Sequence, residues 1–295
     1  MSGPAADLVA RCWFPAAGTP VTCAVSGGAD SLALLVLAVE AGCAVTAIHV
    51  DHGLRPGSRA EADRVAAVAR QLDAAFRSER VVVPAGPNLE ARARRARYAA
   101  LPPDVLTGHT SDDQAETVLL NLVRGAGLDG LAGMDPARRP LRHLRRDETR
   151  RLCAALDLDV VADPTNDDPA FRRNRVRRDL VPLLDAIAER EVVPVIARQA
   201  ELIRADVALL DELAAAIDPQ DARALAGAPT PLARRAVRRW LRRAGSGGAE
   251  QHPPDAASTD RVLAVARGDA VACELAGGWR VARSGGRLRL VAPAR

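Results

Sequence analysis

Two short segments of the sequence carry most of the side chains that could do chemistry. The first is Ser26-Gly27-Gly28-Ala29-Asp30-Ser31, which combines two hydroxyls, two glycines and a carboxylate. It stands between an apolar run and a helix-forming stretch, where glycines let the backbone approach an anion and the free N–H groups of a helix start can bind it. The segment therefore predicts a phosphate site. It is not a Walker loop, because that motif requires a lysine and the sequence contains none.

The second segment contains His109, Asp113 and Glu116, which are spaced four and three residues apart. On a helix this spacing places the three side chains on one face. A purely structural interpretation is a capping box formed by Ser111 and Gln114. That interpretation requires neither His109 nor Glu116, so we favour a functional role for these residues.

The elements that must position these residues alternate between strands and helices. Apolar runs predict strands at residues 21–25, 44–50, 76–83 and 105–108, and helical patterns predict helices at 31–40, 59–72, 89–100 and 112–124. This alternation predicts an α/β fold with a doubly wound, mostly parallel sheet. Ligands of such sheets bind at the carboxyl ends of the strands, which is where both segments fall.

The rest of the chain predicts a second, smaller and mainly helical domain. The first domain should end with helices at residues 146–156 and 173–187, and the second should contain helices at 195–216 and 231–243 and a small antiparallel meander over residues 271–291. We place the boundary near residue 190, giving domains of residues 1–190 and 191–295. Residues 245–258 contain a Gly-Ser-Gly-Gly stretch and a Pro-Pro pair, which predict a mobile loop.

The composition limits the classes of protein that fit. A hydrophobic fraction of 48% with 26% charged residues is ordinary for a globular protein of 295 residues. The net charge of +4 is weak support for a polyanionic partner. All 41 basic residues are arginine, which excludes a catalytic lysine. Five scattered cysteines without a C-x-x-C pair, and no long apolar run, favour a reducing, cytoplasmic setting.

A family resemblance sharpens these expectations. The S-G-G-x-D-S segment resembles the pyrophosphate loop (PP-loop) of the N-type ATP pyrophosphatases, which have a Rossmann-like fold and cleave ATP to AMP and diphosphate. Within that superfamily, ordered segments over residues 20–185 resemble the tRNA(Ile)-lysidine synthetases. These segments are residues 49–55, 107–117, 124–131, 139–141, 163–166 and 173–177.

The resemblance implies a ligase that uses ATP and Mg²⁺. Such an enzyme adenylates the wobble cytidine of the isoleucine tRNA with a CAU anticodon, and the amine of L-lysine then displaces AMP to form lysidine. The implied catalytic residues are Asp30, His109, Asp113 and Glu116, and which acidic residue is the base stays open. The implied ATP site comprises Ser26, Gly27, Gly28, Ala29, Asp30, Ser31, His49, Asp51 and Arg94, with Asp30 also a metal ligand.

The resemblance also implies contacts to the tRNA. The residues that it places there are Arg55, Arg97, Arg124, Gly125, Arg173, Asn174 and Arg177. The second domain would add further tRNA contacts, for which the arginines between residues 234 and 243 are candidates. A homodimer is compatible with the sequence.

Two other functions stay open at this point. A tRNA thiolation enzyme of the same superfamily would also adenylate a base, but sulfur transfer favours a cysteine pair or a reactive cysteine, and no C-x-x-C is present. A non-catalytic RNA-binding homologue would keep the arginines and lose the acidic side chains, which this sequence retains. A dinucleotide site at Gly125-x-Gly127-x-x-Gly130 is rejected, because the motif follows a predicted helix instead of a strand.

Overall fold

The computed structural model describes residues 5–51, 58–83, 86, 89–161, 168–244 and 254–293. The chain divides into two compact units, residues 1–201 and 202–295. The division falls within helix α10 (Val193–Ala215), whereas the sequence places a boundary near residue 190. Among the helices in the described ranges, none is long and apolar enough to cross a membrane.

The first unit is built on a parallel sheet of four strands. These are β1 (Pro20–Ala24), β2 (Ala44–Asp51), β3 (Ala75–Arg80) and β4 (Leu106–Thr107), in the spatial order β3-β2-β1-β4. The α/β fold expected from the alternating pattern is confirmed. Each predicted strand is present, with ends that differ by a few residues.

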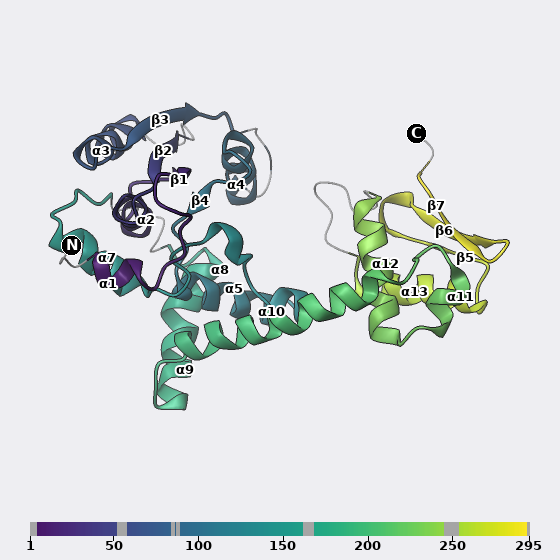
Figure 1. The fold of residues 1–295 in the computed structure, drawn as a ribbon. Helices are drawn as coiled ribbons and strands as arrows, with labels where there is room; N and C mark the ends of the chain where they lie inside the picture. Colours follow the sequence, from purple (N-terminus) through teal and green to yellow (C-terminus); the bar gives the residue numbers. More distant parts are fainter. Residues whose placement is uncertain are drawn as a thin grey trace. The chain divides into compact units, whose positions relative to one another are not determined.

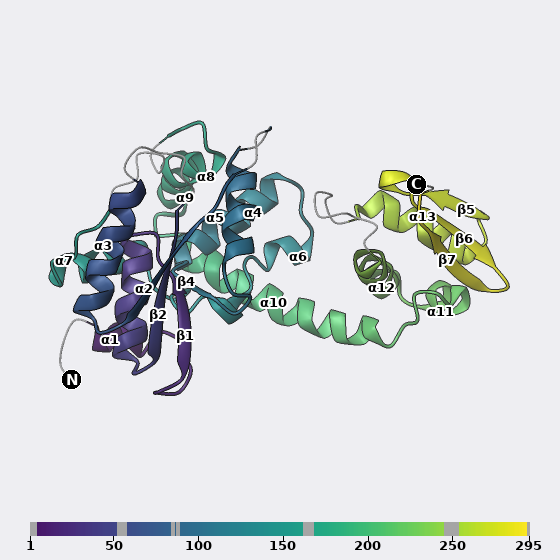
Figure 2. The same cartoon turned by 90° about the horizontal axis from the view of Figure 1, so that it is seen from above.

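Helices cover both faces of this sheet (Figure 1). Helices α2 (Ala29–Glu40) and α3 (Ser58–Gln71) lie on one face, and α4 (Leu89–Ala100) and α5 (Ser111–Val123) lie on the other, as Figure 2 also shows. Helix α2 is apolar on almost all sides, and Leu32, Leu34, Leu35 and Leu37 are completely buried. A helix of this kind is stable only when it is enclosed. It therefore forms the centre of the core.

The strand order determines where a ligand can bind. The chain moves outward from β1 to β2 and β3, and then returns to the other side of β1 to form β4. Residues Cys23 and Ala24 of β1 pair with Leu106 and Thr107 of β4. Between β1 and β4 the direction of winding reverses, and loops at such a switch point diverge to leave a crevice at the carboxyl ends of the strands. The two segments singled out in the sequence both follow these strands.

Helix α7 (Arg146–Ala155) packs beside α2 in the first unit. It follows α6 (Leu128–Leu131) and the short 3₁₀ helix η1 (Pro136–Arg138). Leu152 and Cys153 of α7 are buried, and the Cys153 thiol lies 3.4 Å from the backbone oxygen of Ala29. The N-terminal helix α1 (Ala6–Val9) is followed by Arg11, which forms an ion pair with Glu148 of α7. These contacts hold α7 against the start of α2 and against the segment that follows α1.

The basic helix predicted over residues 173–187 is not a single α-helix. It consists of α8 (Arg172–Arg175), the π-helical turn η3 (Val176–Leu180) and α9 (Val181–Ala188). Pro182 has no N–H group and its ring would clash with a carbonyl of the preceding turn, so a regular α-helix cannot pass through it unchanged. π-Turns inside helices are frequent at functional sites.

The second unit contains α11 (Ala222–Gly227), α12 (Thr230–Arg243) and α13 (Ala256–Arg267). The predicted meander is confirmed: β5 (Ala272–Glu274), β6 (Arg280–Ser284) and β7 (Arg287–Val291) are antiparallel, with η4 (Ala276–Gly278) before β6. Helix α13 overlaps the end of the predicted 245–258 loop, so that part of the prediction is wrong. Asp255 caps α13 by accepting a hydrogen bond from Ser258 N at 2.7 Å. Residues 245–253 lie outside the described residues.

Candidate active site

The loop between β1 and α2 has the backbone that a phosphate cradle requires. Gly27 has a φ of +87°, a conformation that side chains other than hydrogen disfavour. The Ser31 hydroxyl donates to the oxygen of Gly28 at 2.8 Å and accepts from the N–H of Ser26 at 3.1 Å. Gly28 is the N-cap of α2, so Ser31 stands at the third helical position and not at the cap. The loop is thus braced from within.

The loop after β4 passes very close to the start of α2. A Cβ on Gly108 would lie 2.8 Å from the carbonyl carbon of Asp30, and closer still to its oxygen. Only glycine fits at this point without moving one of the two segments. Next to it, the Nδ1 of His109 is 2.8 Å from the hydroxyl of Thr107, which fixes the imidazole at the strand end. The predicted catalytic residues Asp30 and His109 therefore belong to adjoining backbone segments.

The capping box at the start of α5 involves a different pair from the one predicted. Thr110 is the N-cap, and its N–H and hydroxyl contact Oδ2 of Asp113 at 2.9 and 3.0 Å. Thr110 is extended, with φ −100° and ψ 179°, so the helix begins one residue earlier than the predicted box required. Ser111 instead donates to the oxygen of Leu144 at 2.9 Å, and Gln114 bonds the backbone of the loop after α6. The prediction of a Ser111–Gln114 box is wrong.

Arg146, which the sequence did not single out, joins the predicted carboxylates. Its Nη1 lies 3.0 Å from Oε1 of Glu116, its Nη2 lies 3.0 Å from Oδ1 of Asp113, and its Nε lies 3.5 Å from Oδ2 of Asp30. The Arg146 side chain is only 11% exposed. From the same helix, the hydroxyl of Thr149 forms a hydrogen bond with Oδ1 of Asp30. One guanidinium thus connects side chains from α2 and α5.

Two of the predicted tRNA-binding arginines also face this cluster. Arg177 Nε lies 2.7 Å from Oε1 of Glu116, and Arg173 Nε lies 3.1 Å from Oε2 of the same carboxylate. Glu116 is 2% exposed and contacts all three arginines. Within this set, three carboxylates face three guanidinium groups, so their charges balance. We call these six residues the ionic cluster: Asp30, Asp113, Glu116, Arg146, Arg173 and Arg177.

A physical signal could have led to Arg146 from the sequence. The sequence predicts three acidic side chains at one site, and such a site requires cations, because clustered carboxylates repel one another and buried charges are almost always paired. In a chain without lysine the cation must be an arginine. The sequence offers many arginines, and only the packing of α7 on α2 identifies Arg146 as the one that lies in reach.

The carboxylates of the ionic cluster differ in their affinity for protons. Burial opposes ionisation of Asp113, but the charges of Arg146 and His109 and the N–H of Thr110 together lower its pKa to about 2. Burial raises the pKa of Asp30, and the negative charge of Asp113 acts in the same direction, against the opposing effects of Thr149 and Arg146. Asp113 is therefore held as an anion, whereas Asp30 is the carboxylate that takes up a proton more readily.

Of the other residues predicted to lie beside the nucleotide, two lie at the carboxyl end of strand β2 and two have side chains outside the described residues. His49 is buried, and its Nδ1 is 2.9 Å from the oxygen of Val25, so the ring braces β2 against the end of β1. Asp51 ends β2 at the same edge of the sheet. Arg94 lies in α4, but its side chain is not among those described, and Arg55 falls outside the described residues. The structure therefore leaves the roles of these two arginines as predictions.

The other residues predicted to contact the tRNA are not members of the ionic cluster. Asn174 is buried and donates to the oxygen of Asp168 at 2.8 Å, which is a structural bond. The Arg97 guanidinium is stacked on Tyr98 at 5.6 Å from the ring centre. Arg124 and Gly125 are exposed at the end of α5, where Gly125 has a φ of +77°. The latter two are accessible to a large ligand.

The basic helix α12 is partly neutralised within the second unit. Arg234 forms a two-bond pair with Asp260, at 2.6 and 2.9 Å, and Arg235 lies 2.8 Å from Asp211. At the end of the helix, Arg242 and Arg243 are exposed. The structure therefore separates arginines that brace the unit from arginines that face solvent.

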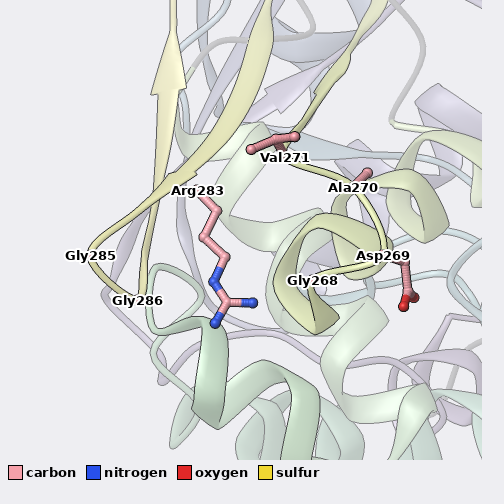
Figure 3. Close-up of a pocket in the computed structure, with 7 residues that line it drawn as sticks. All are labelled: Gly268, Asp269, Ala270, Val271, Arg283, Gly285 and Gly286. Atoms are coloured by element: carbon pink, nitrogen blue, oxygen red, sulfur yellow. The ribbon is translucent and has the colours of Figure 1, made fainter.

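A hollow in the second unit is unrelated to these residues. It lies between the end of α13 and the turn from β6 to β7, and Arg283 extends across it (Figure 3). The Nη1 of Arg283 donates to the oxygen of Ala266 at 2.9 Å, at the carboxyl end of α13. A cation at a helix C-terminus is favourable for the helix, and this contact accounts for Arg283. None of the predicted site residues lines the hollow.

Two families match the chain. The PP-loop domain family matches residues 7–184, and the family described as the TilS substrate binding domain matches residues 221–289. The first match contains the whole ionic cluster. The second covers α11 to most of β7.

Curated relatives match over nearly the full chain. A tRNA(Ile)-lysidine synthase of Nocardia farcinica is 46% identical over 95% of this chain and 90% of its own length. One of Salinispora tropica is 42% identical over 93% of this chain and 91% of its own length. Among solved structures, the U34-tRNA thiolase NcsA of Methanococcus maripaludis has a TM-score of 0.53 at 18% identity, covering 68% of this chain and 78% of that one. At that identity the likeness concerns the fold alone.

Proposed function

Because this chain belongs to the tRNA(Ile)-lysidine synthase family, we propose that it uses ATP to activate the wobble cytidine of the isoleucine tRNA with a CAU anticodon and attaches L-lysine to the activated base. The observation that carries the proposal is the junction between β1 and β4. There the PP-loop lies against Gly108 and His109, and one arginine joins Asp30 to the carboxylates of α5. A phosphate site and an acidic site are thus adjacent.

The first step requires a site for the triphosphate. The free N–H groups at the start of α2 and the hydroxyls of Ser26 and Ser31 are suited to phosphate oxygens, and the helix dipole favours their negative charge. Attack of the cytidine on ATP forms the adenylated base and releases diphosphate. Donors placed before the reaction stabilise the charge that develops on the phosphate oxygens.

The second step requires a lysine with one neutral amine. The unperturbed pKa of such an amine is near 10.4, so it arrives protonated and must lose a proton before or during attack. Burial raises the pKa of Asp30, and its side chain is 27% exposed, compared with 2% for Glu116. We therefore place the amine on the side of Asp30 and His109. The attack forms the new C–N bond and releases AMP.

In this arrangement Glu116 has a different task from the one predicted. Both of its oxygens already contact arginines, so it holds Arg173 and Arg177 in place at the edge of the site. Guanidinium groups in that position are suited to diphosphate or to the phosphates of the tRNA, because their planar fork matches phosphate oxygens. Arg124, at the exposed end of α5, is a further candidate for the tRNA backbone.

Mg²⁺ fits the site as a companion of ATP. This ion prefers one or two carboxylates together with substrate phosphates. In the described part of the chain, no group of three His, Cys, Asp or Glu side chains could hold a metal ion alone. Asp30 stands beside the phosphate loop and could supply one oxygen. When bound, the ion would offset the charge of the phosphates.

The thiolation alternative is disfavoured by the state of the cysteines next to the site. Cys23 in β1 and Cys153 in α7 are buried. Burial raises the pKa of Cys23 to about 12 and that of Cys153 to about 11. Sulfur transfer requires a thiolate, which these two residues do not form near neutral pH.

The direct test uses purified protein, ATP, Mg²⁺, labelled L-lysine and the isoleucine tRNA with a CAU anticodon. We expect the label to enter the tRNA and AMP to appear in equal amount. The same tRNA with uridine at the wobble position is the control for the target base, and Asp30→Ala is the control for the site. The proposal would be overturned if the wild-type protein transferred no label to the tRNA, or if Asp30→Ala kept full activity.

A further inference from the structure

We propose that the first turn of α7 forms part of the active site, together with the PP-loop and α5. Arg146 and Thr149 of this turn are positioning residues. They fix the carboxylate of α2 relative to the carboxylates of α5, and so align the ATP-binding and lysine-binding halves of the site. This inference rests on the proposed function, because it concerns the same reaction. It adds two residues that neither the motifs of the sequence nor the resemblance identified.

Arg146 joins carboxylates from two different helices. Its three guanidinium nitrogens each point to a different carboxylate, at 3.0 Å from Glu116, 3.0 Å from Asp113 and 3.5 Å from Asp30. Asp30 lies in the first turn of α2, whereas the other two lie in α5. A planar guanidinium can serve three acceptors at once in fixed directions, and an ammonium group cannot reproduce that pattern.

Thr149 supplies the second contact to α2. It is completely buried, forms a hydrogen bond with Oδ1 of Asp30, and lies 2.7 Å from the backbone oxygen of Arg146. Residues three apart on a helix share a face, so Arg146 and Thr149 reach Asp30 together. Both oxygens of this carboxylate are thereby oriented from α7.

The base of α7 is itself held in place. Asp112, at the start of α5, accepts from the backbone N–H of Arg146 at 2.9 Å and from Nε of Arg145 at 3.1 Å. On the other side, Leu152 and Cys153 are buried beside α2. The turn that carries Arg146 is therefore fixed to both helices whose carboxylates it joins.

Stability alone does not account for a charge in this position. Replacing a buried ion-pair network by apolar side chains is often neutral or stabilising, because the desolvation of the charges is avoided. Catalysis, in contrast, is sensitive to position, and a displacement of about 1 Å can cost about 100-fold in rate. Without Arg146, Asp30 and Asp113 would lose the guanidinium group that joins them, and the two carboxylates would repel one another.

The test compares arginines on the same helix. Arg150 is 62% exposed and its ion pair with Asp147 is 3.8 Å long, so Arg150→Met is the matched control for Arg146→Met. With a folded Arg146→Met protein, we expect kcat to fall about 100-fold while KM for ATP changes less than about threefold, because the substitution leaves the backbone N–H groups and the serine hydroxyls of the PP-loop in place. Arg146→Lys should recover part of kcat. Arg150→Met should behave as wild type.

A double variant separates positioning from a general loss of structure. If Arg146 acts through Asp113, then Arg146→Met combined with Asp113→Asn should lose no more kcat than the worse single variant. If the kcat losses of the two single variants multiply in the double variant, the inference is overturned. A folded Arg146→Met protein whose kcat lies within about threefold of that of Arg150→Met would also overturn it.

A second variant keeps the inference testable if Arg146→Met does not fold. Thr149→Val preserves the shape and removes the hydrogen bond to Asp30, and we expect about a tenfold lower kcat with an unchanged melting temperature. An unchanged kcat would overturn the role of the α7 turn. Inactive wild-type protein would contradict the proposed function and this inference together. Active wild type with unaffected variants would contradict the inference alone.

Discussion

Arg177 Nε lies 2.7 Å from Oε1 of Glu116, a carboxylate that is 2% exposed. This contact joins the π-helical turn η3 to the middle of α5, across 61 residues of sequence. This contact helps to fix a basic segment at the edge of the candidate active site. Because the carboxylate is buried, the contact has energetic consequences that an exposed pair would not have.

Truncation of Glu116 should destabilise the protein strongly. Glu116→Ala would leave Arg146, Arg173 and Arg177 without their shared acceptor, and removing one partner of a buried pair costs about 3–5 kcal/mol. The free energy of unfolding from urea titration measures this loss. Glu201→Ala is the control, because Glu201 is 45% exposed and should cost less than about 1 kcal/mol. Similar losses in the two variants would contradict the prediction.

Addition of a single methyl group at Gly108 should disturb the junction between the PP-loop and the loop after β4. The Cβ of Gly108→Ala would press on the backbone of Asp30, which cannot yield as a flexible side chain does. We expect a loss of about 1–3 kcal/mol in the free energy of unfolding, together with lower ligase activity. At Gly127 a Cβ meets nothing within 4 Å, so Gly127→Ala is the control. Equal stability of the two variants would argue against a close approach at Gly108.

Acid should weaken the fold through Asp113. Its pKa of about 2 lies below the value near 3.9 of an unfolded chain, so the unfolded state binds the proton more readily. The contribution of this carboxylate is therefore fully present above about pH 4 and is lost as the pH falls towards about 2. It amounts to about 2–3 kcal/mol.

Urea unfolding of the wild type and of Asp113→Asn measures this contribution. The stability difference between them should be largest at about pH 6 and should shrink by about 2 kcal/mol towards about pH 2.5. The raised pKa of Asp30 acts with the opposite sign, and part of that rise comes from the charge of Asp113, so the difference between the two proteins reports the carboxylate of Asp113 together with its effect on Asp30. A stability difference that does not change with pH would show that Asp113 is not held as an anion by its surroundings.

Removal of the His109 imidazole should affect chemistry more than folding. His109 is partly exposed at the end of β4, beside Thr107. Proton transfer by a positioned imidazole contributes about 100- to 10,000-fold, so we expect His109→Ala to lower kcat at least about 100-fold. His143→Ala provides the control, since that side chain is 43% exposed and packs away from the ionic cluster against Glu201. Indistinguishable kcat values for the two variants would remove His109 from the catalytic group.

Several features of this protein could be inferred from its residues because the signals are local. A PP-loop is a short contiguous segment between a strand and a helix, and both of these elements are apolar runs in the sequence. The spacing of Asp113 and Glu116 likewise follows from one helix, α5. The prediction that His109 shares this helix is wrong, because α5 begins at Ser111 after the N-cap Thr110. The meander in the second unit was predictable from short apolar runs separated by glycine pairs. In contrast, α13 was not predicted. One reason is that its capping residue, Asp255, directly follows a Pro-Pro pair, which is typical of a loop.

The sequence by itself determined the type of sheet, the phosphate loop and the acidic face of α5, since each depends on residues that are neighbours along the chain. Only the tertiary structure decided which arginines complete the site. Arg146 and Arg177 are 30 and 61 residues away from Glu116, and many other arginines have the same chemistry. Selection among them depends on the packing of α7 against α2 and on the π-turn that directs Arg177 inward. A buried carboxylate requires a cation, but distance in space, which sequence spacing does not report, determines which one it receives.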